Sequence, residues 1–385
     1  MALFSYQAGE LFRWITEKDN FVLLDVRNSI DFDRFKVEGP YPINTLNISY
    51  FDFMEIEEQC IAQLPDRQSK IRIVCAKEGS AQYVAEILEK NGFIDVGFLA
   101  GGIKSWGNLL VPKPLNHGAD FELYQFIRPA KGSCSYGILS GEQMMLFDPS
   151  RSINFYLDFA DDHNCRIVQT AETHLQADYI SGSRLLTERT GARFYANEQD
   201  FTGAKLDYLP LQDGADIGFG NGGPAVRVTF APGHTPGSTM YIVDDTFIIS
   251  GDTIFIKSVG RPDLGGKAAE WSDYLFNTMR QVAAMDGSMM VLPGHFIDWS
   301  EANSKLNFTE SLEKVRAYNR AIYAIDKKEE FLAFIEANMR EQPPEYATIR
   351  LVNANLKQID DEEAEVLDLG KNECAASAYA AQQQS

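Results

Sequence analysis

Four strand-like runs in the second part of the chain each end in a loop that carries a histidine or an aspartate. The runs end before His174, His234, Asp252 and His295, and the whole chain has only five histidines. Short strands separated by Gly, Asp and Pro predict packed sheets rather than a helical bundle. Since all four side chains follow strands, we expect them to meet at one edge of a sheet sandwich, as the ligands of a metal site do.

The first part of the chain has a different pattern. Predicted strands alternate there with predicted helices, the strands at 21–26, 71–75 and 96–99 and the helices at 9–17, 30–35 and 80–91. Such alternation predicts a small parallel α/β sheet. A chain of 385 residues is too long for one ordinary core, so we expect two domains.

The rest of the chain fits an αββα sandwich followed by helices. Its predicted strands lie at 122–127, 136–140, 144–147, 225–230, 240–243, 246–250 and 289–292, its helices at 153–162, 180–190 and 271–285, and a mostly helical stretch at 303–338. Pro112 and Pro114 discourage regular structure and mark a linker. The predicted organisation is an α/β domain at 5–110, a linker at 111–117, the sandwich at 118–300, and C-terminal helices with a tail at 301–385.

Composition excludes some classes of function. Lys and Arg number 35 and Asp and Glu 55, a net charge of −20. Phosphate backbones and anionic lipids repel such a polyanion, so nucleic acid is not an expected partner. No apolar run approaches the roughly 20 residues of a membrane span. We expect a soluble cytoplasmic protein that forms homo-oligomers and has no membrane partner.

The five cysteines are Cys60, Cys75, Cys134, Cys165 and Cys374, an odd number with irregular spacing. This pattern favours a reducing compartment over a disulfide framework or a structural zinc cluster. We interpret Cys60, Cys134 and Cys165 as packing residues. Cys374 precedes a tail that we expect to be frayed, and we interpret it as an incidental surface cysteine, with a further redox thiol as the alternative.

Cys75 follows a strand-like run and directly precedes a helix. Its loop continues through Ala76, Lys77, Glu78, Gly79 and Ser80. Backbone amides at a helix N-terminus stabilise an anion, so we expect the pKa of Cys75 to be depressed. A thiolate there would attack a sulfane sulfur and hold the resulting persulfide in the loop. The alternative is a buried structural cysteine at a strand end.

Three segments together resemble a rhodanese domain over residues 5–110. They are Asp25–Arg27, the Cys75 loop, and the stretch 99–106 with its two glycines. The resemblance implies sulfurtransferase activity with Cys75 as the nucleophile. Lys77 is the only cation of the loop and lies beside Glu78, so we expect weak recognition of the thiosulfate dianion. Acceptance of a persulfide sulfur is less affected.

The segments around His174, His234 and Asp252 resemble the metallo-β-lactamase superfamily across residues 118–300. The usual loop of that superfamily is His-x-His-x-Asp-His, and here Gln176 and Tyr179 replace two of its histidines. Neither replacement is a good zinc ligand beside imidazole and carboxylate, which disfavours a two-metal hydrolase. Two histidines and one carboxylate form the facial triad of mononuclear non-haem Fe(II) oxygenases.

The resemblance extends to the persulfide dioxygenase branch, which implies that His174, His234 and Asp252 bind the metal. Asp178, His295, Gln176 and Tyr179 would then surround the ligands. We expect Asp178 and His295 to orient ligands or waters, because bound imidazoles and waters need such partners. Tyr179 either donates to bound oxygen or packs beneath its loop.

Arg261 is implied by the same resemblance to lie near the mouth of the site. It either binds a carboxylate of the substrate's thiol carrier or pairs with Asp263.

The expected activity is oxidation of a small thiol persulfide, of glutathione, coenzyme A or a similar carrier, with O2 to sulfite and free thiol. Cys75 would move sulfane sulfur between persulfide, sulfite and thiosulfate. Two alternatives stay open. One is a zinc-dependent thioesterase or glyoxalase II-like hydrolase, and the other is a non-catalytic sulfur carrier or sensor with a vestigial metal site.

Overall fold

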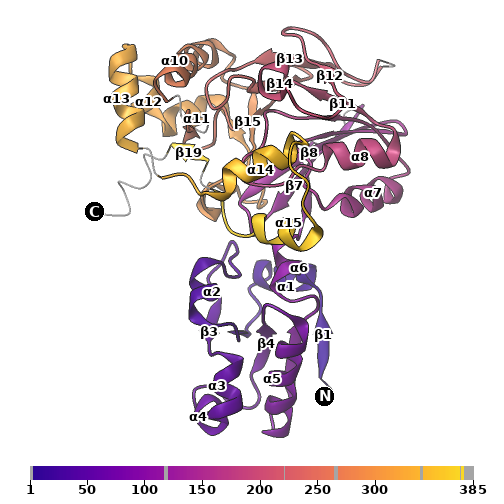
Figure 1. Cartoon of the computed structure of the whole chain (residues 1–385), viewed down its shortest axis with the longest axis vertical. Coiled ribbons are helices and arrows are strands. Elements are labelled where there is room, and N and C mark those ends of the chain that lie inside the picture. The colour runs from indigo at the N-terminus through magenta and orange to yellow at the C-terminus, as the bar shows by residue number, and fades with distance from the viewer. Residues whose placement is uncertain are drawn as a thin grey trace. The chain divides into compact units, whose positions relative to one another are not determined.

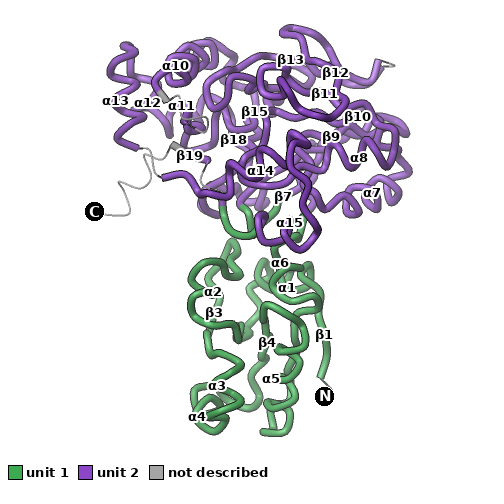
Figure 2. The backbone as a smooth tube through the Cα atoms, in the orientation of Figure 1, with its two compact units in different colours: residues 1–111, 128–131, 369–371 green, residues 112–127, 132–368, 372–385 purple. Residues whose placement is uncertain are grey.

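The computed structural model describes residues 3–116, 120–220, 222–263, 268–338, 341–372 and 374–376. The chain divides into two compact units (Figure 2). Unit 1 comprises residues 1–111, 128–131 and 369–371, and unit 2 comprises residues 112–127, 132–368 and 372–385. His117 and the predicted tail from residue 377 onward lie outside the described residues.

Unit 1 is built on a five-stranded parallel sheet (Figure 1). In spatial order its strands are β1 (Phe4–Tyr6), β5 (Asp95–Leu99), β4 (Lys70–Val74), β2 (Val22–Asp25) and β3 (Asn44–Asn47). The helices are α1 (Ala8–Thr16), α2 (Ser29–Arg34), α3 (Tyr50–Glu55), α4 (Glu57–Ala62), α5 (Glu78–Lys90) and α6 (Ile103–Gly107). The predicted parallel α/β arrangement is confirmed.

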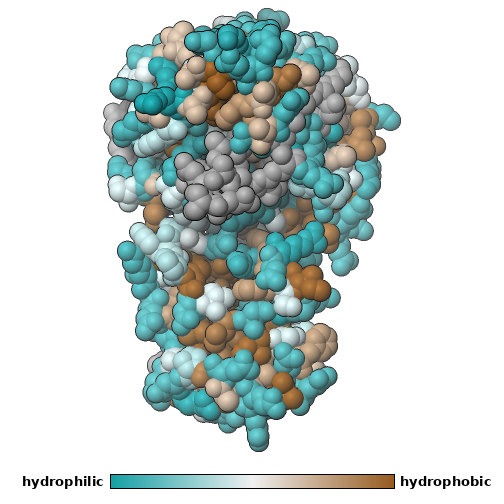
Figure 3. All heavy atoms as spheres, turned by 90° about the vertical axis from the view of Figure 1, so that its left-hand side faces the viewer, coloured by the Kyte–Doolittle hydropathy of each residue, from teal (hydrophilic) through white to brown (hydrophobic). Residues whose placement is uncertain are grey.

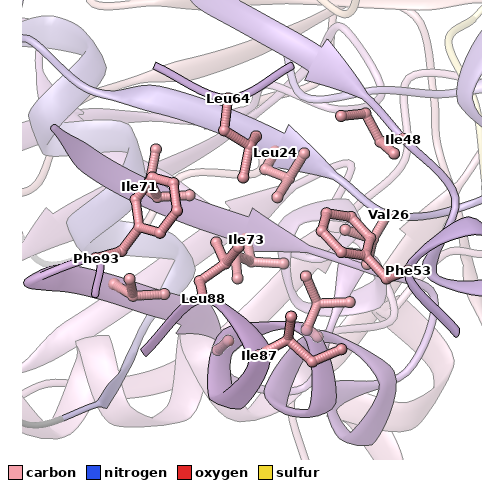
Figure 4. Close-up of a cluster of buried hydrophobic side chains, with 14 of the residues drawn as sticks. Leu24, Val26, Ile48, Phe53, Leu64, Ile71, Ile73, Ile87, Leu88 and Phe93 are labelled. Atoms are coloured by element: carbon pink, nitrogen blue, oxygen red, sulfur yellow. The ribbon is translucent and has the colours of Figure 1, made fainter. Parts of the chain in front are cut away.

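The core of unit 1 explains why these segments form strands. β2 is buried along its whole length, as a parallel strand covered on both faces must be. Leu24, Ile71 and Ile73 from the sheet contribute to one buried cluster with Leu88 of α5 and Phe53 of α3 (Figure 4). Burial of each such side chain contributes about 1.5–3 kcal/mol. The sheet is therefore a firm base for the loops at its strand ends.

Unit 2 contains a seven-stranded sheet and a five-stranded sheet, together with a small two-stranded one. The seven-stranded sheet has the order β12 (Leu209–Pro210), β11 (Arg193–Ala196), β10 (Arg166–Ala171), β9 (Gln143–Phe147), β8 (Ser133–Ser140), β7 (Glu122–Arg128) and β6 (Val111–Pro114). The five-stranded sheet has the order β13 (Val226–Phe230), β14 (Thr239–Val243), β15 (Phe247–Gly251), β17 (Met290–Pro293) and β18 (Glu310–Ser311).

The two larger sheets of unit 2 contact each other and carry helices on their outer faces. Phe147 of β9 lies 4.9 Å from Tyr241 of β14, measured between ring centroids, and the Tyr241 hydroxyl donates to the Glu172 carbonyl at 2.6 Å. Helices α7 (Ile153–Asp162) and α8 (Ser183–Thr190) pack on β10. The αββα prediction is confirmed.

The apolar side of α10 (Ala268–Ala284) packs on the other sheet. Leu275 and Met279 share a buried cluster with Ile242 and Ile248 of β14 and β15. The remaining elements of unit 2 before the C-terminal helices are α9 (Glu198–Phe201), β16 (Val259–Gly260) and the 3-10 turn η1 (Trp299–Glu301).

The linker prediction is wrong in expecting no regular structure at residues 111–114. Val111–Pro114 forms β6 at the edge of the seven-stranded sheet, although it contains two prolines. An edge strand tolerates proline because one side of its backbone has no ladder partner to lose. The backbone amide of Leu115 continues the pairing by donating to the Leu123 carbonyl at 2.8 Å.

The C-terminal region is helical, but it starts later than predicted. Its helices are α11 (Leu312–Tyr318), α12 (Arg320–Tyr323), α13 (Lys328–Asn338), α14 (Glu345–Asn353) and α15 (Asp361–Leu367). No described helix covers residues 303–311, because Glu310–Ser311 pairs with β17 and the Ser311 side chain caps α11. Ala375 and Ala376, predicted to fray, form β19 and pair with β16.

The described helices include none that combines the length and the apolar character needed to cross a membrane. The face shown in Figure 3 is mostly hydrophilic, with smaller groups of hydrophobic side chains between the polar ones.

Candidate functional site

Cys75 lies at the end of β4, within unit 1. Its side chain is buried, whereas Ala76, Lys77, Glu78 and Gly79 are exposed and Ser80 is half-buried. The helix α5 begins at Glu78, two residues earlier than predicted, so the second half of the loop is the first helical turn. The sulfur therefore sits beneath a loop that leads directly into a helix N-terminus, as the sequence predicts.

A second turn closes over the Cys75 loop. The Glu78 carboxylate accepts a hydrogen bond from the Gly101 amide at 2.7 Å, and the Ile103 amide donates to the Cys75 carbonyl at 2.8 Å. Gly102 has φ +65°, and a Cβ there would lie 2.8 Å from the carbonyl oxygens of Cys75 and Ala76. The two glycines thus allow the chain to approach the loop closely.

The predicted direction of the Cys75 pKa shift is wrong. Burial raises the pKa of this thiol, and hydrogen bonds from the amides of Lys77 and Ala76 and from the Ser80 side chain offset only part of that increase. The amides act as expected, but desolvation of the thiolate outweighs them, and the Asp25 carboxylate adds to the increase.

In unit 2, the three predicted metal ligands converge. His174 follows β10, His234 follows β13, and Asp252 follows β15. Nε2 of His174 lies 3.8 Å from Oδ2 of Asp252, and Nε2 of His234 lies 3.4 Å from the same oxygen. One ligand atom from each residue falls within 4.8 Å of the others, and each residue is at most 3% exposed. Side chains distant in sequence thus form one buried cluster.

The other ring nitrogen of each histidine is already engaged. Nδ1 of His234 lies 2.8 Å from the Arg261 carbonyl oxygen, which only accepts, so Nδ1 carries the proton. Nδ1 of His174 lies 2.9 Å from the Thr173 hydroxyl, which itself donates to Asp148 at 2.7 Å. The threonine oxygen therefore accepts from His174, and both imidazoles direct Nε2 lone pairs at Asp252.

Asp200 ties two of the ligand loops together. Its carboxylate accepts hydrogen bonds from the Leu175 amide at 3.0 Å, the Thr235 hydroxyl at 2.6 Å and the Gly237 amide at 2.7 Å. Leu175 adjoins His174 and Thr235 adjoins His234. One half-buried carboxylate therefore fixes the distance between the two histidine loops.

A glycine permits the close approach of the third ligand loop. Gly251 precedes Asp252 with φ +49°, and a Cβ there would lie 2.3 Å from the Thr173 hydroxyl oxygen. A larger residue would push β15 away from the His174 loop and separate the ligands.

The charges of the cluster suit metal binding. Burial lowers the pKa of His174 to about 3 and also lowers that of His234, so both rings are neutral. Burial alone would raise the pKa of Asp252, but His295, His174 and His234 hold it below its usual range. Two neutral imidazoles and one carboxylate are the protonation states that metal ligands require.

Within the described part of the chain, Nε2 of His174, Nε2 of His234 and Oδ2 of Asp252 have no hydrogen-bond partner. Leaving a buried polar atom without a partner is costly, and three such atoms aimed at one point form an arrangement that suits an ion. The residues present therefore fit a divalent cation.

His295 and Asp178 lie beside this cluster. Nδ1 of His295 contacts Asp252 Oδ1 at 2.7 Å, and Nε2 contacts Asp178 Oδ2 at 2.9 Å. Burial by itself would lower the pKa of His295, but the two carboxylates raise it to about 10. The position of His295 agrees with the predicted role of orienting a ligand, here Asp252.

The remaining predicted residues take separate positions. Gln176 is buried, and its backbone carbonyl accepts from Asn353 at 2.9 Å. The Tyr179 hydroxyl donates to the Asp148 carbonyl at 3.1 Å, which fits packing beneath the loop. Arg261 is buried and its guanidinium binds Asp263 at 2.6 and 2.7 Å, the structural alternative of the two that the sequence leaves open.

Sequence reasoning missed the roles of Asp148, Thr173 and Asp200, and it misplaced Cys374. Asp148 and Thr173 orient His174, and the only signal was that Thr173 precedes the histidine and Asp148 ends a strand. The interpretation of Cys374 as a surface cysteine is wrong, because Cys374 is 1% exposed. Its sulfur lies within 4.8 Å of a ligand atom of Asp178 and of His295. Nothing in the local sequence around Cys374 indicates this position.

Comparison with protein-family models identifies both parts of the chain. Residues 8–109 match the rhodanese-like domain, and residues 130–295 match the metallo-beta-lactamase superfamily. The chain thus carries a rhodanese-like domain followed by a metallo-β-lactamase-fold domain.

Curated relatives resemble the second domain. Persulfide dioxygenase ETHE1 of Bos taurus is 26% identical over 205 residues, which are 51% of this chain and 77% of that protein. The human counterpart is 27% identical, over 46% of this chain and 69% of its own length. A hydroxyacylglutathione hydrolase of Anaeromyxobacter dehalogenans is 29% identical, over 60% of this chain and 84% of its own length. The relatives therefore include both dioxygenases and hydrolases.

Solved structures agree on the fold. A metallo-β-lactamase of Staphylococcus aureus matches with a TM-score of 0.55 and 24% identity, over 61% of this chain and 73% of that one. ETHE1 of Myxococcus xanthus matches with a TM-score of 0.52 and 22% identity, over 60% of this chain and 98% of that one. The fusion with a persulfide dioxygenase-like second domain, expected from the sequence, is supported.

Proposed function

We propose that the second domain is a non-haem Fe(II) persulfide dioxygenase that oxidises a small thiol persulfide to sulfite and thiol. The observation that carries the proposal is the convergence of His174, His234 and Asp252 on one buried point with their ligand atoms unpartnered among the described residues. A two-histidine, one-carboxylate set is typical of mononuclear Fe(II) oxygenases. An Fe(II) ion held by these residues would supply O2 activation.

The protein groups around this point fix geometry and exclude bulk water. Thr173 and the Arg261 carbonyl hold the two imidazoles in the tautomer that presents Nε2. His295 holds the Asp252 carboxylate through Oδ1, which leaves Oδ2 for the ion. The low exposure of all three ligands keeps the site dry, which strengthens electrostatic interactions and limits hydrolysis of reactive species.

The proposed reaction balances as persulfide plus O2 plus water giving thiol, sulfite and two protons. The terminal sulfur is oxidised, O2 is reduced, and the sulfur–sulfur bond breaks. In the first domain, the Cys75 thiolate would attack a sulfane sulfur and release the carrier, forming a persulfide on Cys75. Glutathione and coenzyme A persulfides are candidate substrates. All five cysteines are free thiols, which fits the reducing cytoplasm proposed for the protein.

Metal analysis together with oxygen uptake tests the proposal. We expect protein purified without chelators to bind iron and to consume O2 with glutathione or coenzyme A persulfide. His174→Ala should lose the iron and the oxygen uptake. His163→Ala is the matched control, because His163 is partly exposed and its Nδ1 contacts a helix carbonyl. Wild-type oxygen uptake by His174→Ala would refute the iron assignment.

The relatedness to hydroxyacylglutathione hydrolases supports a second candidate, a zinc-dependent thioesterase. Zinc content together with turnover of S-lactoylglutathione would favour it over oxidation. Gln176 and Tyr179 weigh against it, since they stand where the two-metal hydrolases carry histidines. Protein without any bound metal would instead favour a sulfur carrier with a vestigial site.

A further inference from the structure

Glu78 is the acidic side chain of the Cys75 loop, and the structure holds its charge in place. Its carboxylate Oε2 accepts from the Gly101 amide at 2.7 Å, although the residue itself is exposed. The turn that carries Gly101 is tied to the loop in its own right, because the Ile103 amide donates to the Cys75 carbonyl at 2.8 Å. Glu78 also lies in the first turn of α5, where the helix dipole favours a negative charge. The carboxylate is therefore a fixed charge beside the loop.

The cations of the Cys75 loop and of the neighbouring strand end are each matched by a carboxylate. Asp25, whose charge acts on the Cys75 thiol, pairs with Arg27 at 2.6 Å. Lys77, the only cation of the loop itself, is adjacent to Glu78 in the sequence. These side chains therefore give an approaching anion no surplus of positive charge.

Donors of sulfane sulfur differ in the charge that they bring to such a loop. Thiosulfate carries two negative charges on a compact ion, whereas the persulfide of a small thiol carries one at its reacting end. Repulsion by a fixed charge is proportional to the charge of the donor. A carboxylate that slows the persulfide by some factor therefore slows thiosulfate by roughly the square of that factor.

We propose that Glu78 determines which sulfur donor Cys75 accepts, by repelling compact dianions such as thiosulfate and leaving the persulfides of small thiols as donors. This inference rests on the proposed sulfur transfer by Cys75 and deepens it. With either donor the Cys75 thiolate attacks the outer sulfur. One sulfur–sulfur bond forms and another breaks, and the leaving group departs with the bonding electrons, as sulfite or as the carrier thiolate. Since the donors share this step, a change of charge on the loop should separate them.

Single-turnover transfer of sulfur to the full-length protein tests the proposal. The reaction is run without O2, so that oxidation in unit 2 does not consume the donor. The readout is the intact mass of the protein, which rises by one sulfur atom, and Cys75→Ser is the blank. Glu78→Gln retains an oxygen that accepts from Gly101 but removes the charge. We expect its transfer rate to rise about tenfold with thiosulfate and about threefold with glutathione persulfide.

Salt and two further variants separate a charge effect from a structural one. Both gains should shrink at about 1 M salt, where the Debye length is about 3 Å. Glu89→Gln is the matched control, because Glu89 is exposed on α5 about 16 Å further along the helix axis, and it should leave both rates unchanged. Lys77→Gln removes the opposite charge, so it should slow transfer from thiosulfate about tenfold and from the persulfide about threefold.

The contrary results are distinct. Equal changes with both donors, wild-type rates in folded Glu78→Gln, or the same gain in Glu89→Gln would overturn the role of Glu78, and far-ultraviolet circular dichroism checks that each variant is folded. A faster reaction of Lys77→Gln with thiosulfate would overturn it as well. A wild-type protein that takes up sulfur from neither donor would instead refute sulfur transfer by Cys75, and this inference with it.

Discussion

The Cys75 loop and the metal-binding edge of unit 2, formed by the loops of His174, His234, Asp252 and His295, both hold a reactive group at the end of a strand. They do so in different ways. Cys75 is surrounded by the residues that follow it in sequence, mainly through the amides of Ala76 and Lys77. The metal-binding edge brings together side chains from four separate strand ends. The first site therefore depends mainly on its own loop, over which the turn at Gly101 and Gly102 closes, and the second depends on the packing of two sheets.

The pKa values of Cys75 and Asp252 shift in opposite directions, although burial acts in the same direction on both. Burial raises the pKa of Cys75 because desolvation disfavours the thiolate, and the nearby Asp25 carboxylate, which has the same sign of charge, adds a smaller increase. It would also raise the pKa of Asp252, but three imidazoles outweigh it. The comparison teaches that backbone amides alone do not offset the desolvation of a buried anion here, whereas a ring of histidines does.

Reciprocal substitutions should separate the two sites with the largest effect. Asp252→Ala removes the only carboxylate from the set of His174, His234 and Asp252. We therefore expect iron binding and persulfide-dependent oxygen uptake to fall at least 100-fold. Transfer of sulfane sulfur by Cys75 should be unchanged. Cys75→Ser should give the reverse pattern, measured as oxygen uptake and as transfer of sulfur to an acceptor thiol.

The reciprocal pattern has a clear contrary result. If Cys75→Ser lost oxygen uptake with a small persulfide supplied directly, the two sites would not be independent, and the sulfur would have to pass through Cys75 before oxidation.

A smaller effect is expected from the residue that orients His174. Thr173→Val removes the oxygen that accepts from Nδ1 while retaining the shape of the side chain. Loss of such a partner costs about 10–100-fold in metal affinity, which competition with a chelator measures. Thr170→Val in β10, the strand that leads to Thr173, is the control, because the described residues offer its hydroxyl no hydrogen-bond partner. Equal affinities of both variants would show that Thr173 does not orient the ligand.

Much of the fold follows from local pattern. The buried run of β2 and the amphipathic α5 predict an α/β unit, and the short runs of β13, β14, β15 and β17 predict packed sheets. Edge strands are harder to predict from the sequence. β6 contains two prolines and β19 has two alanines, so their strand conformation comes from the partner strand rather than from their own preference.

The site was predictable where ligands follow strands and unpredictable where contacts are long-range. His174, His234 and Asp252 could be expected together because the ends of neighbouring strands meet. Cys374 could not, because its position depends on pairing between β19 and β16. The prediction of the Cys75 pKa shift was wrong for a related reason. Hydrogen bonds within a loop can be inferred from sequence, whereas the depth of burial depends on the rest of the unit.

The smallest effect, and the sharpest test of the contrast in burial, concerns Ser80. Because only the thiolate attacks and burial raises the pKa of Cys75 above the usual value of a thiol, the rate of sulfur transfer should rise with pH through neutrality and on into the alkaline range. Ser80→Ala removes one hydrogen bond that stabilises the thiolate, so the pKa of Cys75 should rise further. The thiolate fraction at pH 7 then falls, while a more basic thiolate is intrinsically more nucleophilic, which offsets only part of that loss.

The net expectation is a slower reaction at pH 7 and a faster one at high pH, so the two pH–rate profiles should cross. Gln82→Ala, an exposed change on the same helix, should leave the profile unchanged. Parallel profiles for Ser80→Ala and the wild type would mean that Ser80 does not stabilise the thiolate. The Cys75 site would then rely on backbone amides alone, and its contrast with the histidine-lined metal edge would be greater still.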